Sequence, residues 1–539
     1  MDRHRAAVTG GARVRTALLL LVPVGFFGVF FAYPIGSILG RGLAPGGSVD
    51  LTPLTHVFSD PGLRGIAWFT LWQAAVSTVL TLAVALPGAY VLARYEFPGK
   101  RIVRALVTVP FVLPTVVVGS AFLALGFQPS LGAILLAHVF FNYAVVVRTV
   151  GGLWSHLDPH QEEAARVLGA SRRRTWWSVT LPALRPALVA AATITFLFTF
   201  TSFGVILVLG GPTRSTLETE IYRQTTQTLN LPLAAALSIV QLVAVVALLV
   251  GTGRAEGRRA TALGLRPSAE VARRPRTARD RAVVGANLVV MAALLGTPVA
   301  VLVARSFDTP GGAGFGFYRA LGSVRAGSVL FVPPTDAIRN SLVYALVATA
   351  IAVTVGGLAA VAAARTRRRV VDGLLSLPLG VSAVTLGFGF LIALDTPPLD
   401  LRTSPWLVPI AQALVAIPFV VRIVGSVLRS IDPRLREAAA TLGAGPARVW
   451  REVDLPIVTR AASVAAAFAF AISLGEFGAT TFIARPNHPT LPIMIFRLLG
   501  QPGAQNFGAA MAASTILMAL TLVAVLGIDR FRVGELGTF

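Results

Sequence analysis

The sequence predicts an all-α polytopic membrane protein with twelve transmembrane helices, arranged as two parallel repeats of six. Three features lead to this prediction: few charged residues, a series of long apolar runs, and a signature that occurs twice in one register. Of the 539 residues, 55% are hydrophobic and 13% are charged, whereas soluble domains contain about 25% charged residues. The mean hydropathy is +0.74. This composition excludes an ordinary soluble enzyme.

Each predicted span is an apolar run long enough to cross about 30 Å of hydrocarbon as an α-helix. The runs lie at 17–40, 66–93, 103–127, 131–152, 186–209, 232–252, 282–304, 338–364, 370–394, 405–428, 460–483 and 507–528. The first run follows four arginines, as a signal peptide would, but no small-residue cleavage site follows it. We therefore expect a retained first helix.

The net charge of +23 is distributed as membrane topology requires. Arginines cluster in alternate loops between the runs, which is the positive-inside pattern. We therefore expect a multi-pass protein of the bacterial plasma (inner) membrane with both termini in the cytoplasm. We expect membrane lipid, and no nucleic acid, as a partner. The chain has no cysteine, which excludes disulfides and cysteine-ligated metals, and we predict neither a catalytic residue nor a metal site.

The chain is an internal duplication. Asp158 aligns with Asp432 at an offset of 274, and this register runs to the last span. Because six spans are an even number, both halves enter the membrane in the same sense, with a pseudo-two-fold axis along the membrane normal. We expect a first half at 1–252, a linker at 253–281 and a second half at 282–539. The linker holds nine arginines and is predicted to be an exposed cytoplasmic tether.

The repeated signature lies in a loop after the fourth span of each half, at about 154–185 and about 429–459. In both copies three residues separate an Ala-Ala pair from a Gly, and nine separate that Gly from a Val. The residues concerned are Glu163, Ala164, Ala165, Gly169, Leu181 and Pro182 in the first copy, and Glu437, Ala438, Ala439, Gly443, Leu455 and Pro456 in the second.

Local chemistry predicts two short helices with a bend in each loop. Asp-Pro at the start suits an N-cap and a first helical position, and Gly169 or Gly443 suits a left-handed helix exit. A second short helix is expected through Trp176 or Trp450, before Leu-Pro leads into the next span. A single such loop would fit a well-capped surface helix equally well. Two copies in one register favour a shared mechanical role.

The signature resembles the cytoplasmic coupling loop of binding-protein-dependent ABC importer permeases. The resemblance implies the type I ABC importer permease fold, and loops that dock into clefts on two copies of a cytoplasmic ABC ATPase. It also implies an extracytoplasmic solute-binding protein as a partner. In that family the Glu pairs with a basic residue of the ATPase, a role that would fall to Glu163 and Glu437, with Gly169 and Gly443 as the bend.

The chain itself lacks the G-x-x-x-x-G-K-[ST] loop that cradles phosphates. We therefore expect that it binds no cofactor, that ATP and Mg are bound by the partner ATPase, and that the chain is not an enzyme.

Candidate pathway residues are polar or aromatic groups at intramembrane positions. Glu476 lies in the eleventh predicted span, and Ser202 is its counterpart in the fifth. A charged group in the hydrocarbon favours function, although a Glu satisfied by nearby backbone or hydroxyl groups is an equal alternative. Phe203 and Phe477 follow these residues. For His138 and Asn142, spaced i, i+4 in the fourth span, an interhelical hydrogen bond is favoured over substrate contact.

The layout of two fused halves is similar to one-chain permeases for thiamine and for ferric iron. The run from Ile134 to Asn142 looks most like the thiamine permeases, so thiamine is the favoured solute. Ferric iron is the alternative, and molybdate- or sulfate-like solutes come next because the run around Glu476 also occurs in their permeases. A secondary transporter of the major facilitator type is a remote alternative, since the loop from Arg94 to Arg101 lacks that family's motif.

Overall fold

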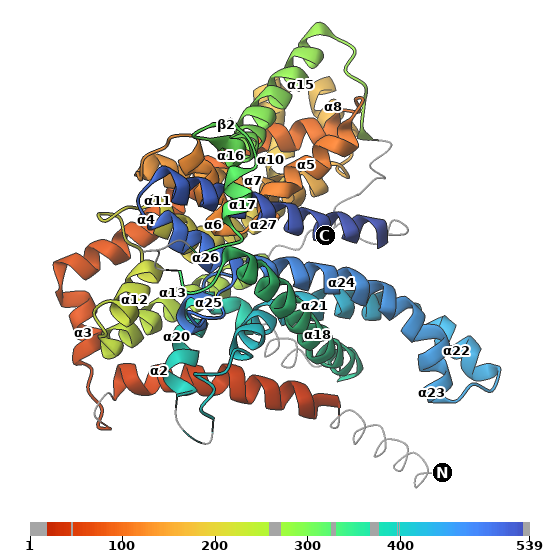
Figure 1. The fold of residues 1–539 in the computed structure, drawn as a ribbon. Helices are drawn as coiled ribbons and strands as arrows, with labels where there is room; N and C mark the ends of the chain where they lie inside the picture. Colours follow the sequence, from red (N-terminus) through yellow and green to blue (C-terminus); the bar gives the residue numbers. More distant parts are fainter. Residues whose placement is uncertain are drawn as a thin grey trace.

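A computed structural model of the chain describes residues 19–44, 47–257, 271–324, 330–366, 377–395, 397 and 399–531 (Figure 1). Within these ranges the fold is helical apart from one small antiparallel ribbon, in which Asp308 pairs with Ala313. The all-α fold predicted from the sequence is confirmed.

The elements of the first half, in chain order, are η1 (Gly28–Ala32), α2 (Tyr33–Leu43), α3 (Thr52–Ser59), α4 (Pro61–Arg94), α5 (Lys100–Val112), α6 (Thr115–Ala124), α7 (Leu131–Trp154), α8 (His160–Val167), α9 (Arg172–Thr175), η2 (Trp176–Thr180), α10 (Leu181–Phe200), α11 (Gly204–Leu209), α12 (Leu217–Thr226) and α13 (Leu231–Gly257). Here η1 and η2 are π-helical turns.

The elements of the second half are α15 (Ala278–Met291), η3 (Ala292–Gly296), α16 (Thr297–Phe307), β1 (Asp308–Thr309), β2 (Gly312–Ala313), α17 (Gly316–Ala320), α18 (Pro334–Thr366), η4 (Leu377–Gly380), α20 (Ala383–Ala393), α21 (Leu407–Ser430), α22 (Pro433–Thr441), α23 (Pro446–Val449), η5 (Trp450–Asp454), α24 (Leu455–Gly475), α25 (Thr480–Ile483), α26 (Leu491–Leu499) and α27 (Ala504–Phe531).

The described residues contain ten helices that are long and apolar enough to cross a membrane. Each corresponds to one of the twelve predicted spans. The third predicted span is instead a bent pair, α5 and α6, whose axes differ by 103°. The break falls next to Pro114, which lacks the amide that a continuous helix needs. Of the ninth predicted span, the turn η4 and the short helix α20 are described, and 370–376 lie outside the described residues.

The fifth and eleventh spans lie earlier in the chain than predicted. They run over Arg172–Phe200 and Pro446–Gly475, and the predicted continuations to 209 and 483 are wrong. Beyond each helix the chain turns and starts a separate short helix, α11 or α25. Glu476 therefore lies just past the end of its span, at the C-cap of α24, and not within it.

Four π-helical turns share one cause. Each of η1, η2, η3 and η5 ends two residues before a proline: Pro34, Pro182, Pro298 and Pro456. A proline inside a helix donates no hydrogen bond and its ring crowds the carbonyl four residues back. A wider π turn before it relieves this crowding and lets the helix continue. Each half thus carries the same two proline-associated turns.

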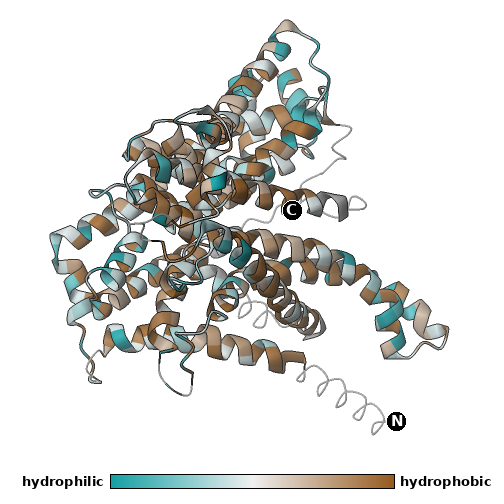
Figure 2. Cartoon of the chain, in the orientation of Figure 1, coloured by the Kyte–Doolittle hydropathy of each residue, from teal (hydrophilic) through white to brown (hydrophobic). Residues whose placement is uncertain are grey.

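The two halves have matching packing and interlock. In the first, α4, α7 and α10 pack together, and their counterparts α18, α21 and α24 do so in the second. The first spanning helix of each half packs against the other half, α2 on α20 and α16 on α6. Figure 1 shows α2 beside α20 at the bottom of the view. Apolar residues predominate along the long helices, and hydrophilic residues gather at the projecting α22 end (Figure 2).

Candidate functional site: two loops and a central contact

The first signature loop is a short helix with a glycine exit. Asp158 Oδ1 accepts a hydrogen bond of 3.0 Å from the His160 amide, and α8 begins at His160. At its end Gly169 has a φ of 86°, a left-handed conformation that suits glycine. The Ala170 amide then donates to the Ala165 carbonyl at 2.9 Å, which closes the helix as a Schellman-type cap.

The second loop repeats this geometry in α22. Asp432 is the N-cap, and its Oδ1 accepts from the Arg434 amide at 2.9 Å. Gly443 has a φ of 81°, and the Ala444 amide donates to the Ala439 carbonyl at 3.0 Å. The two loops therefore share the same glycine exit and closing hydrogen bond although their sequences differ at many positions.

The second short helix predicted in each loop is not separate. It is the first turn of the following span, because α9 and η2 run directly into α10, and α23 and η5 run into α24. Leu181-Pro182 and Leu455-Pro456 lie inside these long helices. The π turn before each proline lets the helix continue although the proline donates no hydrogen bond. Each loop is thus a single short helix joined through a glycine bend to one continuous rod.

The tips of both loops expose apolar side chains. Leu168 is 87% exposed and Leu442 is 88% exposed, and they occupy equivalent positions at the offset of 274. Glu163 and Glu437, one turn earlier, are exposed as well. A leucine in full contact with water gains nothing in the isolated chain, since burying it would be worth about 1.5–3 kcal/mol. The tips are therefore suited to contact another protein.

The root of each loop, where its short helix contacts a neighbouring long helix, is held by a different ion pair. In the first, Arg94 donates to Glu162 Oε1 and to the Leu157 carbonyl, both at 3.0 Å, and Thr180 Oγ1 also donates to Glu162 at 3.0 Å. In the second, Arg436 donates to Asp454 Oδ1 at 2.8 Å. These contacts were not predicted. Arg436 and Asp454 occupy the positions equivalent to Glu162 and Thr180. Once the contact between Glu162 and Thr180 is known, aligning the halves therefore suggests the pair of Arg436 and Asp454.

The described linker segment 271–281 is attached to the first half through its backbone, while its arginines are exposed. The Arg273 amide donates to the Arg94 carbonyl at 3.0 Å, and the Glu96 amide donates to the Arg273 carbonyl at 2.9 Å. Tyr95 is buried, and its hydroxyl donates to Asp280 Oδ1 at 2.7 Å. Backbone pairing accommodates a polar segment whatever its side chains. Residues 258–270 of the linker lie outside the described residues.

A symmetric cluster of four aromatic rings joins the halves. Phe203 and Phe477, which are equivalent and both buried, stack at 5.4 Å between ring centroids. Tyr222 packs edge-on against Phe203 at 5.6 Å, and Phe496 packs in the same way against Phe477 at 5.6 Å. Tyr222 and Phe496 are also equivalent positions. We call these four residues the aromatic cluster.

The predicted polar pathway residues are buried but bonded within the protein. His138 lies 3.0 Å from Ser77 Oγ and 2.9 Å from Ser202 Oγ, so it makes the predicted interhelical hydrogen bonds. Asn142 donates to the His138 carbonyl at 3.0 Å, a bond within its own helix α7 and not the predicted interhelical one. Glu476 accepts from the Ala479 and Thr480 amides at 2.7 and 3.0 Å and from the Thr480 hydroxyl. The bonds of Glu476 favour the structural alternative, in which it caps α25.

The short helices α12 and α26 carry the outer two rings of the aromatic cluster, Tyr222 and Phe496. Their first amides bond to equivalent hydroxyls: Leu217 N to Thr70 at 3.0 Å and Leu491 N to Ser341 at 2.7 Å. The side chains differ, because Glu218 in α12 is fully buried, accepts from Gln241, and accepts from Ser382 of the other half at 3.2 Å. Sequence reasoning missed this contact between the halves.

The chain has the family's features in both halves. Residues 85–252 and 352–531 match the family described as the inner membrane component of binding-protein-dependent transport systems. The chain belongs to this family. It is the permease component of an ABC importer and a multi-pass inner-membrane protein. Membership implies a solute-binding protein and an ATPase as partners in general.

Similar proteins span nearly the whole length of this permease. It is 27% identical over 515 residues to "Probable ABC transporter permease protein y4fN" of Sinorhizobium fredii, covering 88% of each chain. It is also 27% identical over 495 residues to the thiamine transport system permease protein ThiP of Salmonella typhimurium, covering 86% of this chain and 89% of that one. The sulfate transport system permease protein CysT of Escherichia coli is 34% identical over 172 residues, covering 29% of this chain and 62% of that one.

Proposed function

We propose that this permease carries thiamine inward by alternating access, driven by two copies of a cytoplasmic ATPase that dock on the two signature loops. A solute-binding protein on the outer side delivers the solute. In this proposal both loops and both termini face the cytoplasm, in accord with the arginine distribution. The observation that carries the mechanical part is that both loops end in the same left-handed glycine exit, each preceded by a highly exposed leucine.

The continuous helices supply a route from loop to pathway. Arg172–Phe200 is a helix of 29 residues, which spans about 44 Å at 1.5 Å per residue. It begins beside the first loop and ends three residues before Phe203. Pro446–Gly475, a helix of 30 residues, begins beside the second loop and ends two residues before Phe477. A displacement of both loops would therefore be transmitted along two rods to the stacked rings that join the halves.

The choice of thiamine rests on relatives named for thiamine transport that align over nearly the whole chain at 27% identity. The aromatic cluster also suits this solute, because flat aromatic cations pack well against aromatic rings. The sulfate permease relative covers a smaller part of the chain. Ferric iron, the alternative from the sequence, has no contact in the described residues that favours it.

The test is reconstitution of the permease in liposomes with its ATPase and binding protein. We expect ATP-dependent uptake of labelled thiamine that unlabelled thiamine, but not sulfate, competes away. Uptake of sulfate or ferric iron without thiamine uptake would refute the solute assignment and leave the mechanical part intact. Glu437→Arg should leave the protein inserted while uptake no longer follows ATP hydrolysis; normal ATP-driven uptake by this variant would refute the docking role.

A further inference from the structure

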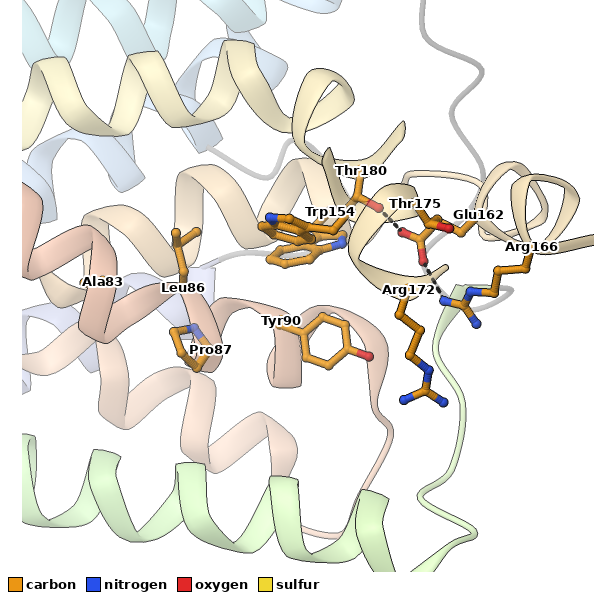
Figure 3. Close-up of a pocket in the computed structure, with 11 residues that line it drawn as sticks. Ala83, Leu86, Pro87, Tyr90, Trp154, Glu162, Arg166, Arg172, Thr175 and Thr180 are labelled. Carbon is orange, nitrogen blue, oxygen red and sulfur yellow. Dashed lines mark hydrogen bonds and ion pairs between the residues drawn. The ribbon is translucent and has the colours of Figure 1, made fainter. Parts of the chain in front are cut away.

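A cavity of about 460 Å³ lies at the root of the first loop, between α4, α7 and the helical turns α8 to η2. Figure 3 shows its aromatic walls, Tyr90 and Trp154, and its charged side, Glu162, Arg166 and Arg172. Its volume lies in the range of roughly 300–1,000 Å³ that is usual for small-molecule sites. Neither the loop's docking role nor the aromatic cluster uses this cavity.

The charge balance of the cavity favours an anion. Glu162 is its single carboxylate, and this is already paired with Arg94 at 3.0 Å and bonded to Thr180. Arg166 lies 3.7 Å from the other oxygen of Glu162. Arg172 makes no side-chain hydrogen bond or ion pair with any described residue. Among the lining residues, Arg166 and Arg172 against Glu162 leave one positive charge in excess, and Arg94 outside the lining already neutralises Glu162.

Comparison of the two halves shows that the fold does not require the aromatic and basic residues that line the cavity. At the equivalent positions of the second half, Leu428 replaces Trp154, Ala440 replaces Arg166 and Pro446 replaces Arg172. That half builds the same loop backbone without them. The aromatic and basic lining is therefore an addition to the first half, and the indole Nε1 of Trp154, a residue only 3% exposed, has no hydrogen-bond partner in the described structure.

The cavity also has an apolar side, formed in part by the spanning helix α4. Ala83 and Pro87, one turn apart on α4, line it and are exposed. Trp176 lines it too, and the neighbouring Trp177 is 61% exposed, as expected for tryptophans at the headgroup level. A ligand that fits would carry an anionic oxygen group next to an apolar tail.

We propose that this cavity binds the phosphodiester headgroup of an anionic phospholipid, with Arg166 and Arg172 contacting the phosphate and the start of an acyl chain lying along Ala83 and Pro87. Basic pockets between membrane helices on the cytoplasmic side are suited to such headgroups, and charged hydrogen bonds from arginine to phosphate are strong. Placement of the cavity at the cytoplasmic leaflet rests on the proposed function; the chemistry of the site does not.

A lipid bound here would act on one loop only. Arg166 belongs to α8, Arg172 begins α9, and the Gly169 bend lies between them. A phosphate held by both arginines would bridge the bend and tie the loop to the membrane surface. The second loop lacks this bridge, so anionic lipid would stiffen the two loops unequally.

The experiment measures binding of short-chain, water-soluble phosphatidylglycerol to the purified full-length permease. Arg166→Gln with Arg172→Gln is compared with Arg173→Gln and Arg174→Gln, which remove the same charge from exposed neighbours outside the cavity. We expect saturable binding that weakens at least about tenfold in the first double variant, as loss of charged hydrogen bonds predicts. Arg166→Lys with Arg172→Lys should retain most of it.

Three outcomes would overturn the proposal. One is equal weakening in the control double variant, which would mean diffuse attraction to the loop surface. Another is equal binding of short-chain phosphatidylcholine, which would mean that the net negative charge is not recognised. The last is displacement of phosphatidylglycerol by inorganic phosphate at the same concentration, which would assign the cavity to a free phosphate. None of these readouts depends on solute transport, so they test lipid binding independently of the proposed function.

Discussion

The two signature loops have the same backbone and opposite chemistry at their roots. In the first, a carboxylate on the loop helix, Glu162, is held by Arg94 of α4. In the second, a cation at the equivalent position, Arg436, is held by Asp454 of the outgoing helix. The shared features, a glycine bend and an exposed leucine, therefore belong to the function common to both loops. The roots have diverged because any stable ion pair can hold the same backbone.

This difference changes what each loop is attached to. Arg94 lies at the end of α4, and its carbonyl accepts the hydrogen bond from Arg273 of the linker. The first loop is thus connected to α4 and, through it, to the linker. Among the residues that the structure describes, the ion pair at the root of the second loop joins the loop helix to its own outgoing helix. Perturbing the tips should affect the halves alike, and perturbing the roots should not.

The largest effect is expected at the tips. Leu168→Asp with Leu442→Asp should abolish co-purification of the ATPase and lower ATP-driven uptake by more than about tenfold, because a charge replaces the apolar contact. Stability should not change, since both side chains are exposed. Val49→Asp, at a residue 82% exposed far from the loops in sequence, is the control. If either single variant alone left ATPase binding unchanged, the equal docking of both loops would be wrong.

Arg94→Ala should have the next largest effect. It leaves Glu162 and the Leu157 carbonyl without their partner in a buried setting, with side-chain exposures of 8% for Arg94 and 21% for Glu162. We expect a local loss of about 2–3 kcal/mol, seen as faster hydrogen exchange of the α8 amides while α22 keeps its protection. Arg101→Ala, seven residues further along the chain and exposed, should change the exchange of neither helix. Equal loosening of both loops would contradict separate roots.

Arg436→Ala should act in the same direction and more weakly. Its pair with Asp454 is more open, with side-chain exposures of 37% and 11%, so we expect about 1 kcal/mol or less. Exchange of the α22 amides is the measurement, and Arg434→Ala on the same helix is the control. A loss as large as that at Arg94 would show that burial does not set the difference between the loops.

The smallest effect is expected at the linker contact. Burial and the hydrogen bond to Asp280 raise the pKa of Tyr95 to about 12 from its ordinary value of 10.0. The folded pKa is above the unfolded one, so the contribution of the protonated hydroxyl is complete below pH 10 and is lost as pH rises through 12. Exchange protection of the Arg273 amide should therefore stay constant from about pH 6 to 9. Tyr95→Phe should lower it by about 1 kcal/mol at every pH in that window.

Much of this architecture could be predicted from the sequence. Apolar runs placed the spans, and the two glycines marked the left-handed exits of α8 and α22. The length of the rods could not be obtained in this way, because Leu181-Pro182 looks like a helix start when the preceding π turn is not considered. The contact between the linker and the end of α4 could not be predicted, because backbone pairing at Arg273 requires no particular side chains in the sequence. Glu476 looked like a pathway charge because sequence does not show the amides that its carboxylate caps.

We predict that displacement of the two loops moves the aromatic cluster through the two rods. The most direct test uses the absence of natural cysteines. Phe203→Cys with Phe477→Cys would be joined by a short bifunctional thiol reagent, and ATP-driven uptake would be measured in liposomes before and after linking, with each single variant as control. We predict that linking stops uptake while the ATPase stays bound. Undiminished uptake by fully linked protein would contradict the account.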